Sequence, residues 1–175
     1  MSTLRERRLQ HDHAALQRLI AESKGRIALE KSESSPAEAY ILVFYCRGVA
    51  SLHDGQPKYT QNQRVRIQFP ALYPAEPPQA VMLSSIFHPH VWPNQTICLG
   101  KWSPAEKLDS LILRIASILV FDPAQFNWKS VANHEAAVWA QHNPTLFPLD
   151  NLFAELPNAR DQHSFSWSED VTPHG

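Results

Sequence analysis

The first hydrophobic pattern along the chain predicts a helix over residues 4–23. Apolar side chains recur there at helical spacing while polar side chains fill the other side. The apolar positions are Leu9, Leu16, Leu19 and Ile20. Thr3 and Glu6 form a capping-box pattern at the start, in which each side chain can satisfy a backbone N–H of the first turn. We therefore expect an amphipathic N-terminal helix.

The pattern then becomes one of strands. Residues 40–46 are rich in β-branched and aromatic side chains, and apolar and polar residues alternate over 65–69, as in a strand with one wet face. Residues 53–55 predict a turn, and residues 80–83 predict a short buried strand. Four prolines within residues 69–78 exclude a central strand and predict a rigid crossing loop.

Two further helices are expected after the strands. Residues 103–106 combine a Ser at the N-cap, a Pro at the first helical position and a Glu two residues later, and apolar residues at helical spacing follow through Leu119. Residues 130–141 predict another helix. Residues 149–156 predict a short helix, and residues 158–175 are expected to be disordered.

This order of elements favours the α+β class. A helix, three or four strands joined by short turns, and then helices are typical of an antiparallel meander with helices at its ends. A doubly wound parallel sheet would need helices alternating with the strands.

Composition narrows the choice of function. The chain has 175 residues, 43% of them hydrophobic, and a formal net charge of −1, which argues against a strongly basic nucleic-acid binder. The lack of a long apolar run argues against a membrane span, and the charged N-terminus predicts no secretory signal. Two cysteines do not make a disulfide framework, so we expect a reducing, cytoplasmic setting.

Charge is distributed unevenly along the chain. Residues 1–31 contain seven basic and four acidic side chains, a net charge of +3, whereas residues 142–175 contain one basic and five acidic side chains, a net charge of −4. Such faces are usually only solvated. A second interpretation is that the positive N-terminal face docks an acidic partner.

Residues 86–106 carry the candidate chemistry, since a long segment without helix or strand pattern often holds functional groups. In a purely structural interpretation, Cys98 is a core residue. In a second, His88, His90 and Cys98, with His53, bind zinc, although no fourth ligand has convincing spacing, and we expect no metal. In a third, Cys98 is a thiolate nucleophile with His90 as its neighbour.

The third interpretation gains weight from a resemblance. Four collinear motifs resemble the signature of ubiquitin-conjugating enzymes: Phe69-Pro-x-x-Tyr-Pro-x-x-Pro-Pro78, His88-Pro-His90, Ile97-Cys98-Leu99 and Trp102-Ser-Pro-Ala105. The similarity implies the fold of that family, with an N-terminal helix, a four-stranded antiparallel meander and C-terminal helices. It implies a conjugating-enzyme-like domain over residues 1–143 and a C-terminal extension over 144–175, partly disordered.

The resemblance also implies an activity without a cofactor. Cys98 would accept the C-terminal glycine of a ubiquitin-like protein from an activating enzyme as a thioester, and an amine of a protein substrate would then attack that thioester. The basic residues Arg5, Arg7 and Arg8 match the helical face that meets the activating enzyme. Ser103, Pro104 and Ala105 match a ligase-binding segment, although the exposed aromatic residue that accompanies it in the family aligns with Ala75.

The chain departs from the family at two catalytic positions. His90 stands where the family has an Asn that supports the loop or stabilises the oxyanion, and an imidazole can donate a hydrogen bond or act as a base near neutral pH. The family's acidic residue falls near Phe126 or Asn127, where no carboxylate stands. His88 and Trp102 are expected to support the loop.

These departures leave two functional classes open. The first is a thioester-forming enzyme. Residues 40–47 and 136–139 resemble bacterial conjugating-enzyme-like proteins, some of which act in antiphage defence. The second is a non-catalytic module of the same fold that binds a ubiquitin-like protein or scaffolds its activating enzyme. The presence of Cys98 in the expected context favours the first.

Overall fold

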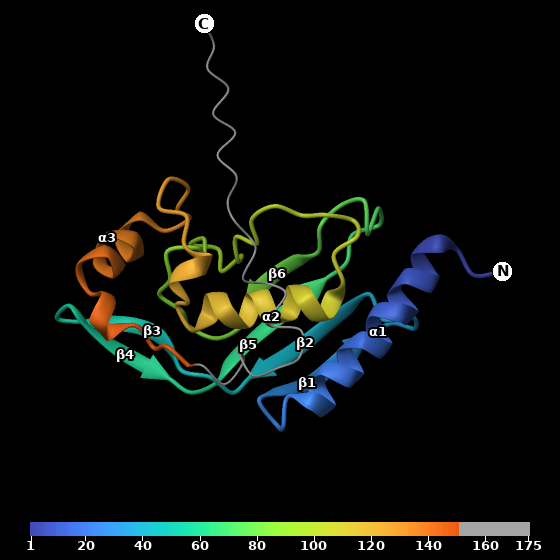
Figure 1. Cartoon of the computed structure of the whole chain (residues 1–175), viewed down its shortest axis with the longest axis horizontal. Coiled ribbons are helices and arrows are strands. Elements are labelled where there is room, and N and C mark those ends of the chain that lie inside the picture. The colour runs from blue at the N-terminus through green and yellow to red at the C-terminus, as the bar shows by residue number, and fades with distance from the viewer. Residues whose placement is uncertain (151–175) are drawn as a thin grey trace, which may run out of the picture.

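The computed structural model describes residues 1–150 and has one N-terminal helix, six strands and two further helices (Figure 1). In chain order the elements are α1 (Leu4–Glu22), β1 (Ile27–Glu33), β2 (Ala39–Phe44), β3 (Gly48–His53), β4 (Gln56–Thr60), β5 (Gln63–Gln68), β6 (Gln79–Met82), α2 (Leu108–Leu119), the 3₁₀ turn η1 (Pro123–Gln125), α3 (His134–His142) and the 3₁₀ turn η2 (Pro144–Leu146). The expected α+β class is confirmed.

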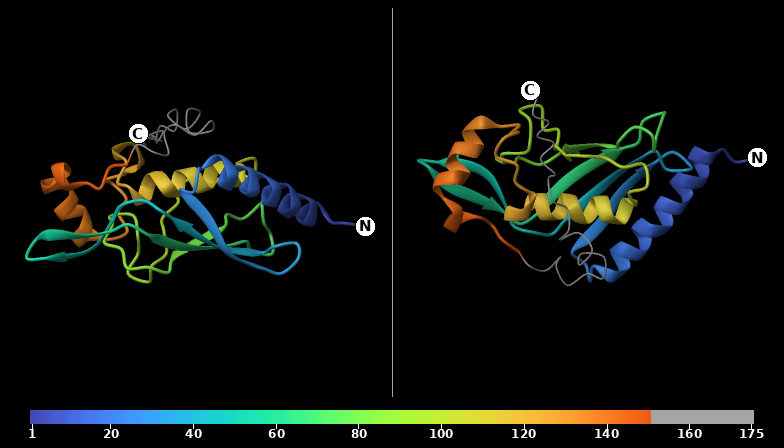
Figure 2. Two further views of the ribbon diagram at one scale, coloured as in Figure 1. Left: turned by 90° about the horizontal axis from the view of Figure 1, so that it is seen from below. Right: turned by 45° about the horizontal axis from the view of Figure 1, so that its top comes forward.

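The main sheet is antiparallel, with the strand order β1-β2-β5-β6. Strands β3 and β4, which lie between β2 and β5 in the sequence, form a separate two-stranded hairpin. Figure 1 shows it extending from one end of the main sheet. The turn predicted at residues 53–55 joins the two strands of this hairpin. Helices α1 and α2 lie on the same face of the main sheet (Figure 2).

Strand β1 is absent from the sequence-based expectation. Its residues do not alternate cleanly, because it ends in the charged and polar run Glu30 to Glu33 and carries an irregularity between Leu29 and Lys31. Edge strands tolerate such charge, since one of their edges stays open to solvent and charged side chains there discourage pairing with other chains. Pairing with β2 makes this segment a strand, and no local pattern marks that pairing.

Helix α1 begins as predicted. The Thr3 hydroxyl accepts the Glu6 backbone N–H at 3.1 Å, and the Glu6 carboxylate accepts the Thr3 N–H at 2.7 Å. Its apolar face is buried against the sheet and α2. The buried face also includes one charged residue, Asp12, whose carboxylate pairs with Arg8.

The start of α2 differs from the expectation. The helix begins at Leu108 with Lys107 at its N-cap, and the Ser103 hydroxyl instead accepts the Ala105 N–H, at 3.3 Å, within a preceding turn. Glu106 directs its carboxylate to Arg114 at 2.7 and 2.8 Å rather than back to the backbone of Ser103. A tertiary ion pair thus takes the side chain that the capping-box pattern assigned to a local bond.

The interior consists of two hydrophobic clusters. The larger lies between the main sheet and helices α1 and α2. The smaller joins the β3–β4 hairpin to the chain after α2, and it contains Val49, Phe121, Phe126, Trp139 and Ala140. Within residues 1–150, no helix is both long enough and apolar enough to cross a membrane.

The first residues of the predicted C-terminal extension pack on the second cluster. Phe147 lies with its ring centre 5.2 Å from that of Phe121 and 5.5 Å from that of Phe126, and the Tyr59 hydroxyl donates to the Leu146 carbonyl at 2.6 Å. The Asp150 carboxylate pairs with Arg26 at 2.5 Å. The division at residue 143 stays a prediction. The disorder expected over 158–175, and nearly all of the helix expected over 149–156, fall outside the described residues.

We expect Phe147→Ala to lower the free energy of unfolding by about 2 kcal/mol, because a ring packed between two aromatic side chains leaves a cavity when it is removed. Urea unfolding followed by tryptophan fluorescence measures the change. Leu149→Ala is the control, since Leu149 is 56% exposed. A Phe147→Ala variant as stable as the wild type would show that this ring contributes nothing to the fold.

Candidate active site

Cys98 lies at the end of a segment that is fixed to the edge of the main sheet. The Ile97 N–H donates to the Ala80 carbonyl of β6 at 2.9 Å, and Val91 and Ile97 form an isolated bridge. The Cys98 N–H then donates to the His90 carbonyl at 2.8 Å. The side chain of Cys98 is partly exposed. A thiol in this position is reachable from solvent on a backbone that is held in place.

The chain after Cys98 is short and anchored at its far end. Three residues separate Cys98 from Trp102, and the Trp102 indole N–H donates to the Pro74 carbonyl at 2.8 Å. Its ring also lies against Tyr73, with ring centres 6.0 Å apart. Gly100 has a φ of +72°, a conformation that glycine adopts without strain. The supporting role that the sequence suggested for Trp102 stays a prediction.

His88 lies in an aromatic environment beneath this segment. Its Nδ1 accepts the His90 backbone N–H at 2.9 Å, and its ring meets Phe121 edge-on, with ring centres 4.4 Å apart. Burial and, to a smaller extent, His90 lower the pKa of His88 to about 3, against the opposite effect of a backbone hydrogen bond with Ile118. His88 is therefore neutral near pH 7 and fixes the turn of the His-Pro-His segment.

His90 is also buried, with 3% of its surface exposed, and burial lowers its pKa. Its Nε2 accepts the backbone N–H of Asn127 at 3.0 Å. A ring nitrogen that accepts carries no proton, so we assign the proton of the neutral imidazole to Nδ1. The role of His90 stays a prediction, and this geometry favours loop support over proton transfer.

The loop after α2 is held on the His-Pro-His segment by backbone groups. Besides the bond from Asn127, the N–H groups of Ala132 and Asn133 both donate to the Pro89 carbonyl, at 2.8 and 3.0 Å. The Asn127 side chain accepts the Lys129 N–H at 3.1 Å, so its carboxamide stabilises the loop itself.

Aromatic stacking connects this loop to the two histidines. The Phe126 ring lies 5.7 Å from each histidine ring, measured between ring centres, and Trp128 stacks on Phe126 at 4.7 Å. Trp128 keeps 40% of its surface exposed. The sequence reasoning placed Phe126 only at the position of the family's acidic residue and did not connect its ring, or that of Trp128, with the two histidines, although two aromatic residues in a loop that should be polar were a usable signal.

A buried ion pair from α2 reaches the same segment, and the sequence reasoning missed it. Arg114 is 5% exposed and donates to the carbonyls of Leu99 and Lys101, while its other nitrogen pairs with both oxygens of Glu106. An arginine within the apolar run of α2 was the signal, because charged side chains are rarely buried unless they are paired.

The basic residues of α1 divide into two kinds. Arg5 donates to the Pro70 carbonyl at 3.1 and 3.2 Å and pairs with Glu38 at 2.5 Å, and Arg8 pairs with Asp12 at 2.8 Å. Both guanidinium groups therefore bind within the molecule. Arg7 is exposed on the helix surface. Of the three residues predicted to face a partner, Arg7 is the one whose side chain is presented to solvent.

Ser103, Pro104 and Ala105 are exposed in the turn before α2. The Pro104 carbonyl accepts from Arg8 at 2.6 Å, so α1 holds this turn from within. The predicted ligase-binding segment thus lies at the surface on a backbone fixed from below.

The residues weighed as zinc ligands do not converge. The His53 side chain is 91% exposed beside Asp54 in the β3–β4 hairpin, whereas His88 and His90 face Phe126. Among residues 1–150, no group of three or more His, Cys, Asp or Glu side chains could hold a metal ion.

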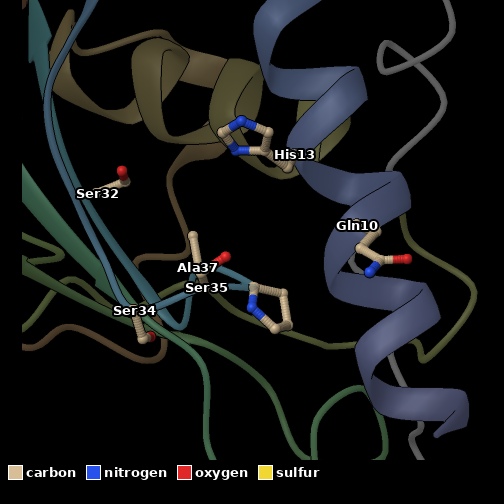
Figure 3. Close-up of a pocket in the computed structure, with 7 residues that line it drawn as sticks. Gln10, His13, Ser32, Ser34, Ser35 and Ala37 are labelled. Atoms are coloured by element: carbon tan, nitrogen blue, oxygen red, sulfur yellow. The ribbon is translucent and has the colours of Figure 1, made fainter. Parts of the chain in front are cut away.

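A polar cavity of about 690 Å³ lies elsewhere, between α1 and the turn from β1 to β2. Figure 3 shows the His13 ring on the side of α1 that faces Ser32, Ser34 and Ser35, and Gln10 on the same helix. The His13 ring hydrogen-bonds the Tyr40 hydroxyl at 3.0 Å. None of its lining residues belongs to the Cys98 segment, so the candidate active site is the surface around Cys98 and not this cavity.

Comparison with known proteins gives a consistent set of matches. A family model described as ubiquitin-conjugating enzyme matches residues 50–150, which include Cys98. Similar curated proteins include ubiquitin-conjugating enzyme E2 2 of Debaryomyces hansenii, 33% identical over 111 residues (61% of this chain and 59% of that protein). Its namesake in Saccharomyces cerevisiae is 34% identical over 112 residues (62% and 58%). The ubiquitin-conjugating enzyme E2 of African swine fever virus is 30% identical over 86 residues (42% and 38%). The chain thus spans less than two thirds of the length of these relatives.

The buried histidines predict a loss of stability in acid. An unfolded histidine titrates near pH 6.5, above the pKa of about 3 that His88 has in the native state, so the unfolded state binds more protons between these values and stability falls with pH. From pH 7 to pH 5 we expect the contribution of His88 to fall by about 2 kcal/mol. Urea unfolding of the wild type and His88→Gln at both pH values measures it. The exposed His134, changed to Gln, is the control, and parallel losses in all three proteins would contradict the prediction.

Proposed function

Because the chain belongs to the ubiquitin-conjugating enzyme family, we propose that Cys98 carries a ubiquitin-like protein as a thioester between an activating enzyme and an amine acceptor. The observation that carries this proposal is the placement of Cys98. Its thiol is partly exposed, and its backbone is held by the His90 carbonyl at 2.8 Å. The matched span of the family model contains this residue.

The reaction consists of two acyl transfers. The Cys98 thiolate attacks the carbonyl of the thioester on the activating enzyme, a new C–S bond forms, and the thiolate of the activating enzyme leaves. An acceptor amine then attacks the Cys98 thioester, a C–N bond forms, the Cys98 thiolate leaves, and the amine loses a proton to solvent. A thiolate suits both steps because it is a strong nucleophile and a good leaving group.

His90 and Asn127 serve this reaction as positioning residues in our proposal. The imidazole of His90 accepts the Asn127 N–H, while the His90 carbonyl holds the Cys98 N–H. One residue therefore bridges the nucleophile and the loop after α2. Loop support in the family is ascribed to an Asn, and here an imidazole acceptor takes that part.

No carboxylate stands at residue 126 or 127 to receive the amine proton. Asp122, the acidic residue at the start of this loop, accepts the Ala124 N–H at 3.0 Å as a cap of η1. We therefore propose that the acceptor ammonium first loses one proton to solvent and then attacks as the neutral amine, so that the pH of the solution sets the fraction of reactive amine.

The partners follow from the same proposal. The N-terminal helix would meet the activating enzyme, with Arg7 exposed at its surface, and the turn at Ser103, Pro104 and Ala105 would face further partners. Two free cysteines accord with a reducing, cytoplasmic setting. From the resemblance to bacterial members we extend the proposal to a prokaryotic conjugation system that acts in antiphage defence.

Charging tests the proposed function directly. A mixture of the protein, ATP, an activating enzyme and its ubiquitin-like protein should give a reductant-sensitive adduct on the wild type, a reductant-resistant ester on Cys98→Ser and none on Cys98→Ala. Gels run with and without thiol reductant show these products. Cys46→Ala is the matched control and should charge normally, because burial raises the pKa of the Cys46 thiol to about 12.

The opposite result has a definite meaning. If the activating enzyme becomes charged and the wild type does not, the protein is the non-catalytic module, which binds a ubiquitin-like protein or scaffolds the activating enzyme. The missing carboxylate near residue 127 would then mark lost chemistry.

Single-turnover discharge to free lysine tests the part assigned to His90. An amine of pKa near 10 gains about tenfold in reactive fraction per pH unit, so the rate should rise about tenfold per unit from pH 6 to pH 9. His90→Asn should lower the rate without changing the shape of this profile, because burial lowers the pKa of His90 and its Nε2 already accepts the Asn127 N–H. His134→Asn, at an exposed position, is the control. A change of shape in His90→Asn would place the imidazole in proton transfer.

A further inference from the structure

The Arg114 guanidinium joins the middle of α2 to the chain that immediately follows Cys98. It donates to the carbonyl of Leu99 and, at 3.4 Å, to that of Lys101. These carbonyls flank Gly100, whose φ of +72° turns the chain. The segment between Cys98 and Trp102 therefore directs two of its three backbone oxygens toward one buried cation.

Glu106 and α1 hold this cation in turn. The Glu106 carboxylate accepts from Arg114 at 2.7 and 2.8 Å in a two-pronged pair, with 15% of its side chain exposed. The backbone carbonyl of Glu106 accepts from Arg8 at 2.5 Å, and Arg8 also pairs with Asp12. The contacts form a continuous path from α1 to the residue after the candidate nucleophile.

We propose that Arg114 is a positioning residue for acyl transfer at Cys98, and that Glu106 orients it. This inference rests on the proposed thioester function of Cys98. On one side of Cys98, its own N–H is held by the His90 carbonyl. On the other side, Arg114 holds the Leu99 carbonyl, so the backbone on both sides of the sulfur-bearing residue is fixed.

The shortness of the segment explains why a cation is used here. Three residues between Cys98 and the anchored Trp102 are too few to form a helix or strand of their own, so their carbonyls have no helix or sheet partner, and Arg114 supplies N–H donors to two of them. An arginine presents several N–H groups in a planar fork, and it can serve a carboxylate and two carbonyls at once. A lysine has a single ammonium group and cannot reproduce this arrangement.

Position matters for the reaction because attack on the thioester has a narrow geometry. A displacement of about 1 Å in a reacting group can lower a rate about a hundredfold. We therefore expect loss of the Arg114 contacts to lower discharge of the Cys98 thioester by about ten- to a hundredfold.

The experiment separates positioning from stability by use of a paired variant. Arg114→Met alone leaves the Glu106 carboxylate buried without its cation and is expected to lower the melting temperature. Arg114→Met combined with Glu106→Gln removes both charges, and stability should largely return, because replacing a buried ion pair by neutral residues is often tolerated. The double variant should nevertheless discharge to free lysine about ten- to a hundredfold more slowly than the wild type.

Two further variants sharpen the comparison. Arg114→Lys keeps a charge beside Glu106 but loses the fork, and it should also discharge slowly while it remains folded. The pair Arg66 and Glu33, 2.8 Å apart on the main sheet, provides the matched control. Arg66→Met with Glu33→Gln should discharge at the wild-type rate.

A second measurement does not depend on the ubiquitin-like protein. Labelling with a trifluoromethyl alkylating reagent near neutral pH selects Cys98, since Cys46 is 2% exposed. The ¹⁹F signal should be a single line in the wild type and should shift or broaden in the double variant.

The outcomes of these measurements are distinct. A double variant with the melting temperature, discharge rate and ¹⁹F line of the wild type would show that the ion pair is only structural and would overturn this inference, while the proposed function would stand. A wild type that never charges, beside an activating enzyme that does, would overturn both.

Discussion

The segment between β6 and α2 contains no helix or strand, so its buried backbone groups find their partners in irregular bonds of its own, such as that from the Cys98 N–H to the His90 carbonyl, and in groups from the rest of the molecule. Buried N–H and carbonyl groups without partners are costly, so this constraint shapes everything around Cys98. β6 supplies the first partners, through the Ala80 carbonyl. The guanidinium groups of Arg8 and Arg114 supply the last. As a result, the partly exposed thiol of Cys98 lies on a loop whose backbone is held on both sides of the residue.

The same constraint decides what the two histidines do. In the sequence they stand beside a cysteine, as a base or a metal ligand would. In the fold their ring nitrogens accept backbone N–H groups, His88 from His90 and His90 from Asn127. Because both rings pack against Phe126, burial lowers the pKa of each and keeps it neutral. The surroundings of an imidazole, more than its distance from a nucleophile along the chain, set its chemistry.

In the basic N-terminal helix, too, the net charge does not show which side chains face solvent. A net charge of +3 over residues 1–31 suggests a surface that meets an acidic partner. Two of the three arginines named for that surface bind carboxylates and carbonyls of their own chain. Their guanidinium groups hold the loop at residues 69–78 and the turn before α2. What remains at the surface is Arg7 and the helix side around it.

The sequence by itself determined the elements whose cause is local. The start and apolar stripe of α1 follow from its capping box and helical periodicity, and the cores of β2, β5 and β6 follow from local side-chain composition and alternation. The motif around Cys98 pointed to the family without any geometry. The tertiary structure alone decided β1, which exists through pairing with β2, and the use of Glu106 as a partner of Arg114 instead of a helix cap. These outcomes depend on hydrogen bonds to groups that are distant in the chain. The pattern within one segment shows only its local bonds, so it cannot show that a distant partner will replace them.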